Sequence, residues 1–357
     1  MIEYYHWNII GAGVLAFVMS FFIIPSVIKI ADIKHLYDSP NERKSHSSSI
    51  PTLGGLGIFS GFIVSTCLFS NFTAGHEIQY IVAALLIIFM MGAKDDIVDM
   101  SAKKKLLGQI VAAFIITYFG EIRLTSLYGV FNITDIPEWF SIAFSMFTII
   151  VITNSFNLID GVNLLAGSIS IVITMTFGAW FFFHSFHNYS IMAAAMIGAV
   201  LAFLKYNFTP AKIFMGDSGS LTVGFLVSIF AIQFIELNEI VLARNMDVRF
   251  TIHSTPGMAI AIMIIPLYDT IRAFTLRVMR GKSPFEADRN HIHHKLLDLG
   301  FSHLQTSLIL IAINFLFIVL GYELQFLNNT WLIIALILIA ICISTILFSI
   351  KKPIIKR

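Results

Sequence analysis

Residues 78–99 read IQYIVAALLIIFMMGAKDDIVD. The apolar run 78–93 approaches the length that a helix needs to cross a bilayer, and two adjacent carboxylates, Asp95 and Asp96, follow it. Carboxylates are costly in hydrocarbon, so acidic residues beside a membrane span usually have a function. This stretch therefore predicts a membrane fold with a polar site at one membrane surface.

The composition of the whole chain places it among membrane proteins. Hydrophobic residues make up 57% of its 357 residues and charged residues only 12%, whereas an ordinary soluble domain is about 25% charged. The net charge of +2 is too small to indicate a nucleic-acid partner. Neither an internal repeat nor a low-complexity linker divides the chain, so we predict a single integral-membrane domain over 1–357.

Apolar runs recur along the chain and predict an all-α polytopic protein. There are eleven such runs, so we predict eleven transmembrane helices, with ten as the alternative. An odd number of spans places the termini on opposite faces, and we expect the N-terminus outside and the C-terminus in the cytosol. The predicted spans are 8–30, 53–70, 78–93, 106–120, 138–155, 162–183, 190–204, 219–236, 257–275, 306–322 and 331–350.

The distribution of positive charge supports this arrangement. If the C-terminal tail is cytosolic, all of the 23 Lys and Arg residues except Arg123, Arg244 and Arg249 fall in predicted cytosolic segments. Such a bias is the one that the positive-inside rule describes. Adding or removing one span would scramble it, so the charges favour both the count and the orientation.

Under this topology the polar clusters lie on the cytosolic face. Asp95 and Asp96 are followed by Asp99 and by three lysines at 103–105. Two adjacent carboxylates repel each other, which favours a bound cation or a raised pKa, and either suits a site for phosphate and magnesium. The alternative is a pair of solvated residues at a helix end.

Two further clusters contain oxygen ligands. Asn157 and Asp160 are spaced to share one face of a helical turn, although a capped break between two spans would also use these residue types. Residues 216–220 read GDSGS, which matches the nucleophile motif of trypsin-like proteases, but those enzymes are soluble β-barrels. Glycines and a helix N-terminus favour a bound diphosphate instead, and Asp217 offers a hard oxygen to magnesium.

Histidines form the fourth cluster. His291, His293 and His294 follow shortly after Arg289. Their spacing differs from the i, i+4 pattern of a zinc enzyme, and no cysteine is nearby, so contacts with phosphate or nucleotide are the favoured interpretation. A solvated polar loop is the alternative.

Six segments in sequence order resemble the polyprenyl-phosphate N-acetylhexosamine-1-phosphate transferases of glycosyltransferase family 4. The form of the histidine segment and the span count look more like the WecA and TagO branch than the related MraY. One departure is that the family usually has Gly-Leu-Ala where this chain has Asn163-Leu164-Leu165-Ala166. The segments are RKSH at 43–46 with PTLGG at 51–55, DDIVD at 95–99, NSFNLIDG at 154–161, MGDSGS at 215–220, PLYDT at 266–270 and RNHIHH at 289–294.

The resemblance implies a reaction. A UDP-N-acetylhexosamine, for which we expect UDP-GlcNAc, and undecaprenyl phosphate would give the undecaprenyl-diphosphate sugar and UMP. This would be the first membrane step of a cell-envelope polysaccharide such as a cell-wall polymer or the O-antigen of lipopolysaccharide. The alternatives are another UDP-HexNAc or UDP-MurNAc-pentapeptide as donor and, more distantly, a polytopic transporter. A transporter predicts charges in mid-span, whereas these acids lie at one face.

The resemblance also implies roles for individual residues. Asn157 and Asp217 would bind Mg²⁺, with Mn²⁺ as the alternative metal. Asp95 and Asp96 would flank the site of attack, one of them as a base, and Lys105 would contact phosphate. The remaining predicted site residues are Asp99 and Asp160 as acidic supports in the catalytic group, and Arg289, His291, His293, His294 and Asp269 in the substrate-binding group.

Location and partners follow from the same resemblance. We expect a multi-pass protein of the bacterial inner membrane with its active site on the cytosolic face. The expected partners are the UDP-sugar, undecaprenyl phosphate and the lipid bilayer, with no nucleic acid. The sequence leaves the oligomeric state open between a monomer and a homodimer.

Overall fold

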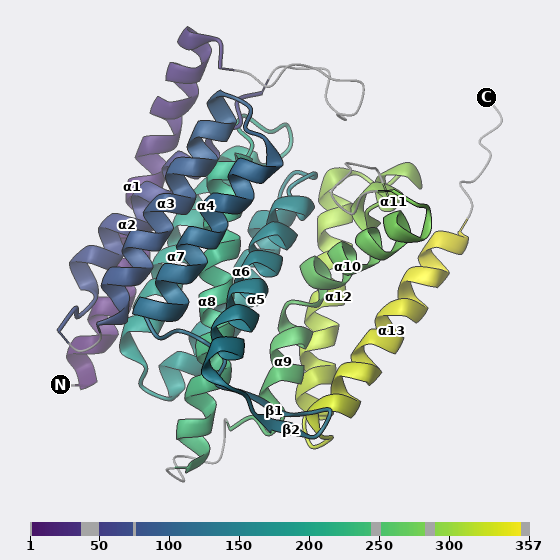
Figure 1. Ribbon diagram of the computed structural model, residues 1–357. Helices are drawn as coiled ribbons and strands as arrows, with labels where there is room; N and C mark the ends of the chain where they lie inside the picture. The colour runs from purple at the N-terminus through teal and green to yellow at the C-terminus, as the bar shows by residue number, and fades with distance from the viewer. Residues whose placement is uncertain (1, 37–49, 74–75, 244–250, 283–289, 351–357) are drawn as a thin grey trace.

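Helices make up most of the computed structural model, which describes residues 2–36, 50–73, 76–243, 251–282 and 290–350 (Figure 1). The elements are α1 (Ile2–Lys34), α2 (Gly54–Phe69), α3 (Glu77–Ile97), α4 (Ala102–Phe114), the π-helical turn η1 (Ile115–Phe119), β1 (Ser126–Val130), β2 (Ile133–Asp135), α5 (Glu138–Ile159), α6 (Leu165–Phe183), α7 (His187–Asn207), α8 (Gly216–Ala243), α9 (Thr255–Ile262), α10 (Ile264–Met279), α11 (Ile292–Asp298), α12 (His303–Glu323) and α13 (Asn329–Ser349).

Eight helices in the described ranges are long and apolar enough to cross a membrane, namely α1, α3, α5, α6, α7, α8, α12 and α13. The pair α9 and α10 makes a ninth if its 83° bend lies within one span, and α2 is a shorter apolar helix. Each predicted run falls on one helix or on two consecutive helical segments. The polytopic helical class is thus confirmed, while the count of eleven stays a prediction.

Pro266 explains the break between α9 and α10. A proline inside a helix lacks the N–H group for the helical hydrogen bond, and its ring clashes with the carbonyl four residues earlier. That residue is Ile262, the last residue of α9. The predicted span 257–275 is therefore two short helices that meet at Met263, rather than one continuous helix.

A small β-hairpin departs from the all-α prediction. β1 and β2 pair antiparallel, with Val130 opposite Ile133. The two residues between them, Phe131 and Asn132, have φ angles of +54° and +61°. Positive φ at both positions is typical of the tight turn that joins antiparallel strands. The usual Asn-Gly or Asp-Gly signal is missing here, so the residue pattern did not indicate the hairpin.

α8 is the central helix of the bundle. In the described residues 83% of its apolar window is buried, against 22% for α1 and α13. A Cβ on Gly55 of α2 would overlap the backbone nitrogen of Gly219, and a Cβ on Gly92 of α3 would lie 2.6 Å from the Cα of Ser218. Small residues allow such close backbone contact between membrane helices. α2 and α3 therefore converge on the first turn of α8.

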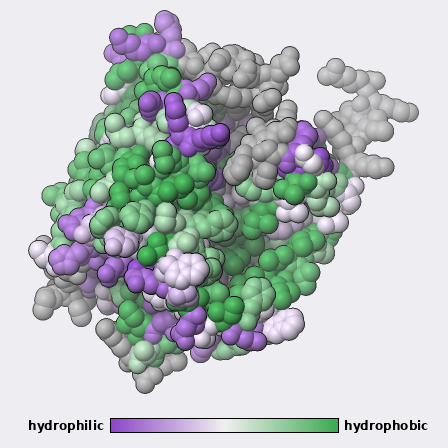
Figure 2. Space-filling view, viewed as in Figure 1, coloured by the Kyte–Doolittle hydropathy of each residue, from purple (hydrophilic) through white to green (hydrophobic). Residues whose placement is uncertain are grey.

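The outer surface carries large apolar side chains. Figure 2 shows one face that is largely hydrophobic, with hydrophilic side chains gathered toward its two ends. Trp7, Phe22 and Met90 have exposed fractions of 71%, 69% and 60%. Apolar surface of this extent is unfavourable in water and favourable against lipid. The structure is that of a multi-pass membrane protein.

Candidate active site

Four helix ends meet at the end of the bundle opposite to the hairpin, where α3 and α5 end and α4 and α8 begin (Figure 1). The segment before α2 anchors the start of α8. The N–H of Phe214 donates to the carbonyl of Pro51 at 2.8 Å, and the N–H of Gly54 donates back to Phe214 at 2.9 Å. The N–H of Gly55 then reaches the carbonyl of Met215 at 2.9 Å. This short ladder fixes where α8 starts.

Lys105 joins two of the predicted acidic residues. Its Nζ lies 2.5 Å from Oδ2 of Asp95 and 2.7 Å from Oδ2 of Asp217. Burial acts to lower the pKa of the Lys105 ammonium, but the carboxylates of Asp217 and Asp95 outweigh it, so its pKa is raised. The Lys105 side chain is 27% exposed and can therefore be approached from solvent.

Asp96 caps α8. Its Oδ1 accepts the backbone N–H of Asp217 at 2.7 Å, and its Oδ2 accepts the backbone N–H and the hydroxyl of Ser218 at 3.0 and 2.5 Å. The first N–H groups of a helix lack partners within it, and a negative charge there is favourable. Gly216 has φ +70°, and a Cβ on it would lie 2.7 Å from Oδ1 of Asp96. Asp96 thus holds the turn that presents Asp217.

Asn157 contacts the other oxygen of Asp217. Its Nδ2 donates to Oδ1 of Asp217 at 2.8 Å and to the Ser220 hydroxyl at 3.0 Å. The two residues expected to bind metal therefore touch each other across α5 and α8. Neither Ser218 nor Ser220 was singled out from the sequence, although both lie in the Gly-Asp-Ser-Gly-Ser segment.

Asp160 follows the last residue of α5 and lies beside this cluster. Burial raises the pKa of the Asp160 carboxyl well above its usual range, and the charges of Asp217 and Asp96 raise it further. A backbone hydrogen bond with Gly216 acts in the opposite direction. Three carboxylates close together disfavour full ionisation, so added positive charge is favourable here.

A second polar group, on α10 and α11, holds the histidine segment. Asp269 accepts from Nδ1 of His291 at 2.9 Å and from the backbone N–H of Ile292 at 2.8 Å. Nε2 of His291 lies 3.2 Å from a guanidinium nitrogen of Arg277, which is 2% exposed. Arginine only donates, so Nε2 accepts and Nδ1 carries the proton. Both ring nitrogens of His291 are thus engaged within the protein.

His293 connects the two groups. It is 2% exposed, and its Nδ1 is 3.7 Å from Oδ2 of Asp269. A Cβ on Gly161 would lie 2.9 Å from Nε2 of His293, so the imidazole packs directly against the residue after Asp160. Burial lowers the pKa of His293 to about 3, against the charge of Asp269, and His293 is neutral at pH 7. The ring of His294 lies 4.3 Å from that of His293.

Not every predicted residue joins these groups. Asp99 is exposed beyond the end of α3. Arg289 lies outside the described residues. Two further residues had no role in the sequence analysis. Arg277 supports His291, and Gly161 contacts His293. Their only signal was position: Gly161 follows Asp160 directly, and Arg277 lies two helical turns after Asp269 on α10.

The donor set fits magnesium. Asp217 and Asn157 supply a carboxylate and an amide oxygen, which are ligands that Mg²⁺ takes. Mg²⁺ usually has few protein ligands and keeps waters and phosphates. No group of three or more His, Cys, Asp or Glu side chains that could hold a metal ion occurs in the described ranges. The ammonium of Lys105 between Asp95 and Asp217 shows that this position stabilises positive charge.

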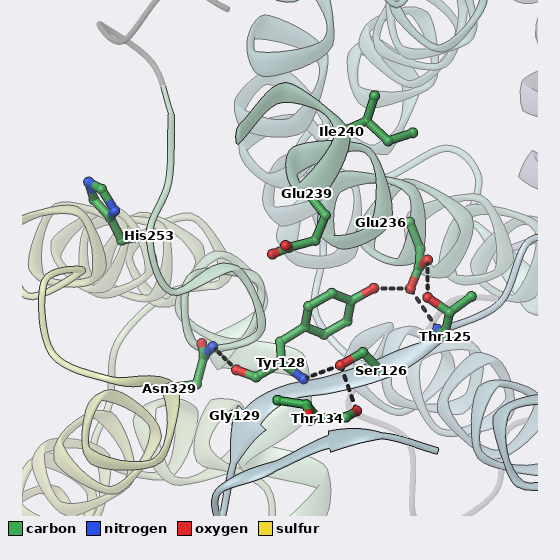
Figure 3. Close-up of a pocket in the computed structure, with 10 residues that line it drawn as sticks. All are labelled: Thr125, Ser126, Tyr128, Gly129, Thr134, Glu236, Glu239, Ile240, His253 and Asn329. Atoms are coloured by element: carbon green, nitrogen blue, oxygen red, sulfur yellow. Dashed lines mark hydrogen bonds between the residues drawn. The ribbon is translucent and has the colours of Figure 1, made fainter. Parts of the chain in front are cut away.

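A cavity elsewhere in the protein lies far from these residues. It has a volume of about 680 Å³ and lies at the hairpin end, where Glu236 accepts from the backbone N–H and the hydroxyl of Thr125 at 2.8 Å each and from the Tyr128 hydroxyl (Figure 3). Glu236 is about 28 Å along α8 from Asp217 at 1.5 Å per residue. None of the predicted site residues lines this cavity.

Leu164 stands at the departure from the family pattern. Its φ is +70°, a left-handed backbone conformation that favours glycine. The N–H of Leu164 donates to Oδ1 of Asn207 at 2.6 Å, and the side chain is buried. Burial and this hydrogen bond hold a leucine in a turn that suits the glycine usual in the family.

The fold and the site define an integral membrane protein with an acidic, basic and imidazole-bearing site suited to phosphate groups. Residues 78–235 match the model of glycosyl transferase family 4. The chain is 32% identical over 343 residues to the probable undecaprenyl-phosphate N-acetylglucosaminyl 1-phosphate transferase of Bacillus subtilis (strain 168), which covers 95% of this chain and 91% of the relative. This chain belongs to glycosyl transferase family 4, as predicted.

Other relatives agree. The undecaprenyl-phosphate alpha-N-acetylglucosaminyl 1-phosphate transferase of Escherichia coli (strain K12) is 30% identical over 319 residues, with 87% of this chain and 83% of that protein covered. The protein of the same name from Yersinia pestis is 29% identical over 337 residues, with 92% and 87% covered. The similarity therefore extends over nearly the whole chain and includes both polar groups.

Proposed function

We propose that this protein transfers N-acetylglucosamine 1-phosphate from UDP-GlcNAc to undecaprenyl phosphate and releases UMP. The relatives' names support the acceptor and the sugar phosphate. The observation that carries the proposal is the Lys105 ammonium between Asp95 and Asp217, with Asn157 on the opposite oxygen of Asp217. In this proposal the Lys105 ammonium neutralises charge on the diphosphate, and the oxygen donors beside it would hold a metal ion that does the same.

In the proposed reaction a phosphate oxygen of the lipid attacks the β-phosphorus of the nucleotide sugar, and the bond from that phosphorus to UMP breaks. One diphosphate bond replaces another, so the protein's contribution is placement and charge neutralisation. Lys105 contacts a phosphate oxygen, and Asp95 orients Lys105 and accepts any proton left on the attacking phosphate. Asp217 and Asn157 would hold Mg²⁺, with Mn²⁺ as a substitute, and the ion would neutralise charge on the diphosphate.

Asp96 and the histidine group have supporting parts in this proposal. Asp96 holds the N-terminus of α8, so it orients Asp217. His293 offers a neutral ring nitrogen and His294 a second imidazole to the phosphates of the donor, while Asp269 and His291 hold α11 in place. Arg289 joins them as a phosphate contact in the proposal.

The site faces the cytosol of a bacterial cell in this proposal, because UDP-sugars are made there. The charge bias of the predicted eleven-span topology, with the N-terminus outside, supports this placement. Labelling with a membrane-impermeant maleimide tests it. With Cys67 and Cys342 replaced by serine, a cysteine at Asp99 should react from the cytosolic side only and a cysteine at Thr134 from the outer side only.

The decisive experiment is UMP release by the purified protein with undecaprenyl phosphate and Mg²⁺. The donor panel contains UDP-GlcNAc, UDP-GalNAc and UDP-MurNAc-pentapeptide, and we expect turnover with UDP-GlcNAc to exceed that with the other two. Preference for another member of the panel would keep the reaction and change the donor. No UMP from any donor, together with solute uptake into vesicles, would favour a transporter.

A further inference from the structure

A reciprocal pair of side-chain amides joins α4 to α5 beside the carboxylate cluster. Nδ2 of Asn154 donates to Oε1 of Gln109 at 2.7 Å, and Nε2 of Gln109 donates back to Oδ1 of Asn154 at 3.2 Å. Gln109 is 3% exposed and Asn154 is half-buried, so these bonds are partly shielded from water. In the part of the chain that the structure describes, no other side-chain hydrogen bond links α4 to α5.

The amides of this pair are directed at the protein rather than at a substrate. The second Nδ2 hydrogen of Asn154 donates to the carbonyl of Ile150 at 2.7 Å, so both of its amide hydrogens have protein acceptors. A buried amide that loses its partner is strongly unfavourable. The pair is therefore held together and keeps α4 and α5 at a fixed separation.

Each amide lies one helical turn from a residue that touches Asp217. Lys105 precedes Gln109 by four residues on α4, and Asn157 follows Asn154 by three residues on α5. These spacings place each pair on one helix face. Nζ of Lys105 lies 2.7 Å from Oδ2 of Asp217, and Nδ2 of Asn157 lies 2.8 Å from Oδ1. Side-chain hydrogen bonds and single helical turns thus connect these residues across α4, α5 and α8.

We infer that Gln109 and Asn154 are positioning residues for the transfer reaction, an inference that rests on the proposed function. Their pairing fixes where Lys105 and Asn157 stand on the two sides of Asp217. α4 needs such a tie because it has only 13 residues and passes directly into the π-helical turn η1. A displacement of about 1 Å around a reacting group costs about 100-fold in rate.

The test compares Gln109→Leu with a transposed double variant, Gln109→Asn with Asn154→Gln. The leucine keeps the size and removes the hydrogen bonds, whereas the transposed pair keeps both amides and their combined length. For Gln109→Leu we expect kcat to fall by about 10- to 100-fold, with KM for UDP-GlcNAc changed by less than about threefold. The transposed variant should regain activity to within about tenfold of the unaltered protein.

A second readout does not depend on turnover. The rate at which an acylating reagent modifies Lys105, followed by mass spectrometry, reports how firmly its ammonium is paired, because only the free amine reacts. We expect this rate to rise several-fold in Gln109→Leu and to return in the transposed variant. The exposed Lys103 and Lys104 are internal references that should not change.

Asn314→Leu is the matched control. Asn314 is fully buried on α12, and its Nδ2 donates to the carbonyl of Ile262 at 3.1 Å, so it also ties two helices but lies apart from Asp217. We expect its kcat and Lys105 reactivity to match the unaltered protein. An equal fall of kcat in the control would overturn the inference. Unchanged Lys105 reactivity in Gln109→Leu would also overturn it. So would a transposed variant whose activity is no higher than that of Gln109→Leu. Absence of UMP release by the unaltered protein would reject the proposed function, while Lys105 reactivity would still decide whether the amide pair positions Lys105.

Discussion

The carboxylate of Asp96 accepts the backbone N–H of Asp217 at 2.7 Å, across 121 residues of sequence. Its chain neighbour Asp95 pairs with Lys105 instead. Two adjacent acids of the same type thus differ in partner: one holds the backbone of α8, and the other faces the side chains around which the reaction is proposed to occur.

This division predicts different effects for the two amide substitutions. Asp96→Asn replaces an acceptor oxygen with a donor at the N-terminus of α8, so we expect the free energy of unfolding to fall by about 0.5–2 kcal/mol, as for the loss of a helix cap, together with activity. Asp95→Asn should lower activity without that loss of stability. Thermal unfolding in detergent, with UMP release measured on the same preparations, compares them. Equal melting temperatures for the two variants would contradict the capping role.

Asp217→Asn should nearly abolish turnover while the protein still folds and inserts. The substitution removes the charge that pairs with Lys105 and the carboxylate proposed to hold magnesium. We expect kcat to fall by at least about 100-fold, the scale seen when one electrostatic stabiliser is removed. Glu239→Gln, at the opposite end of α8, removes a carboxylate outside the site and should keep normal activity. Normal magnesium-dependent turnover in Asp217→Asn would show that the metal assignment is wrong.

The two histidines should give different phenotypes. His293→Ala should raise KM for the nucleotide sugar more than KM for the lipid, because the imidazole stands at the junction of the two polar groups. His291→Ala should lower the melting temperature, because Asp269 and Arg277 are both buried and each would lose a hydrogen-bond partner. Steady-state kinetics with each substrate varied, alongside thermal unfolding, separates the roles. A larger rise in lipid KM for His293→Ala would refute its assignment to the donor.

Acidification should destabilise the fold through His293. Its folded pKa is about 3, whereas an unfolded histidine has a pKa of about 6.5, so the unfolded state binds more protons. The stability that buried, neutral His293 contributes is fully present above about pH 6.5 and is lost progressively as the pH falls toward 3. By pH 5 the loss is on the order of 2 kcal/mol. His293→Gln cannot titrate at this position, so it should lose less stability than the unaltered protein between pH 7.5 and pH 5. Thermal unfolding at each pH measures this difference, and equal losses in the two proteins would show that His293 is not the cause.

Close helix contact at the site should make Gly55 intolerant of a side chain. A Cβ there overlaps the backbone of α8, which cannot move without displacing Asp217. We expect Gly55→Ala to lower both the melting temperature and the turnover. In Gly108→Ala the new methyl group would meet the flexible side chain of Met91, which can move aside, so that variant should lose less. The same unfolding and activity assays compare the pair, and equal losses would show that backbone overlap is not the cause.

The membrane class and the location of the polar clusters were predictable from the sequence. Composition and runs of apolar residues are local properties, and hydrocarbon imposes them directly on the chain. The placement of acids and histidines at the ends of apolar runs needed no further information. The hairpin was not predictable, because Phe131-Asn132 lacks the glycine that usually marks its turn. The break at Met263 was likewise missed, although Pro266 was a visible cause.

The sequence by itself determined that this chain is a helical membrane protein with acids, amides and imidazoles beside its spans. Only the tertiary structure decided which of them meet: Lys105 reaches Asp217 across 112 residues, and Asn157 reaches it across 60. The physical reason is that hydropathy constrains each helix separately. The choice between equivalent partners such as Asp95 and Asp96 depends on how closely glycine-bearing helices approach α8 and on the direction in which each carboxylate then points.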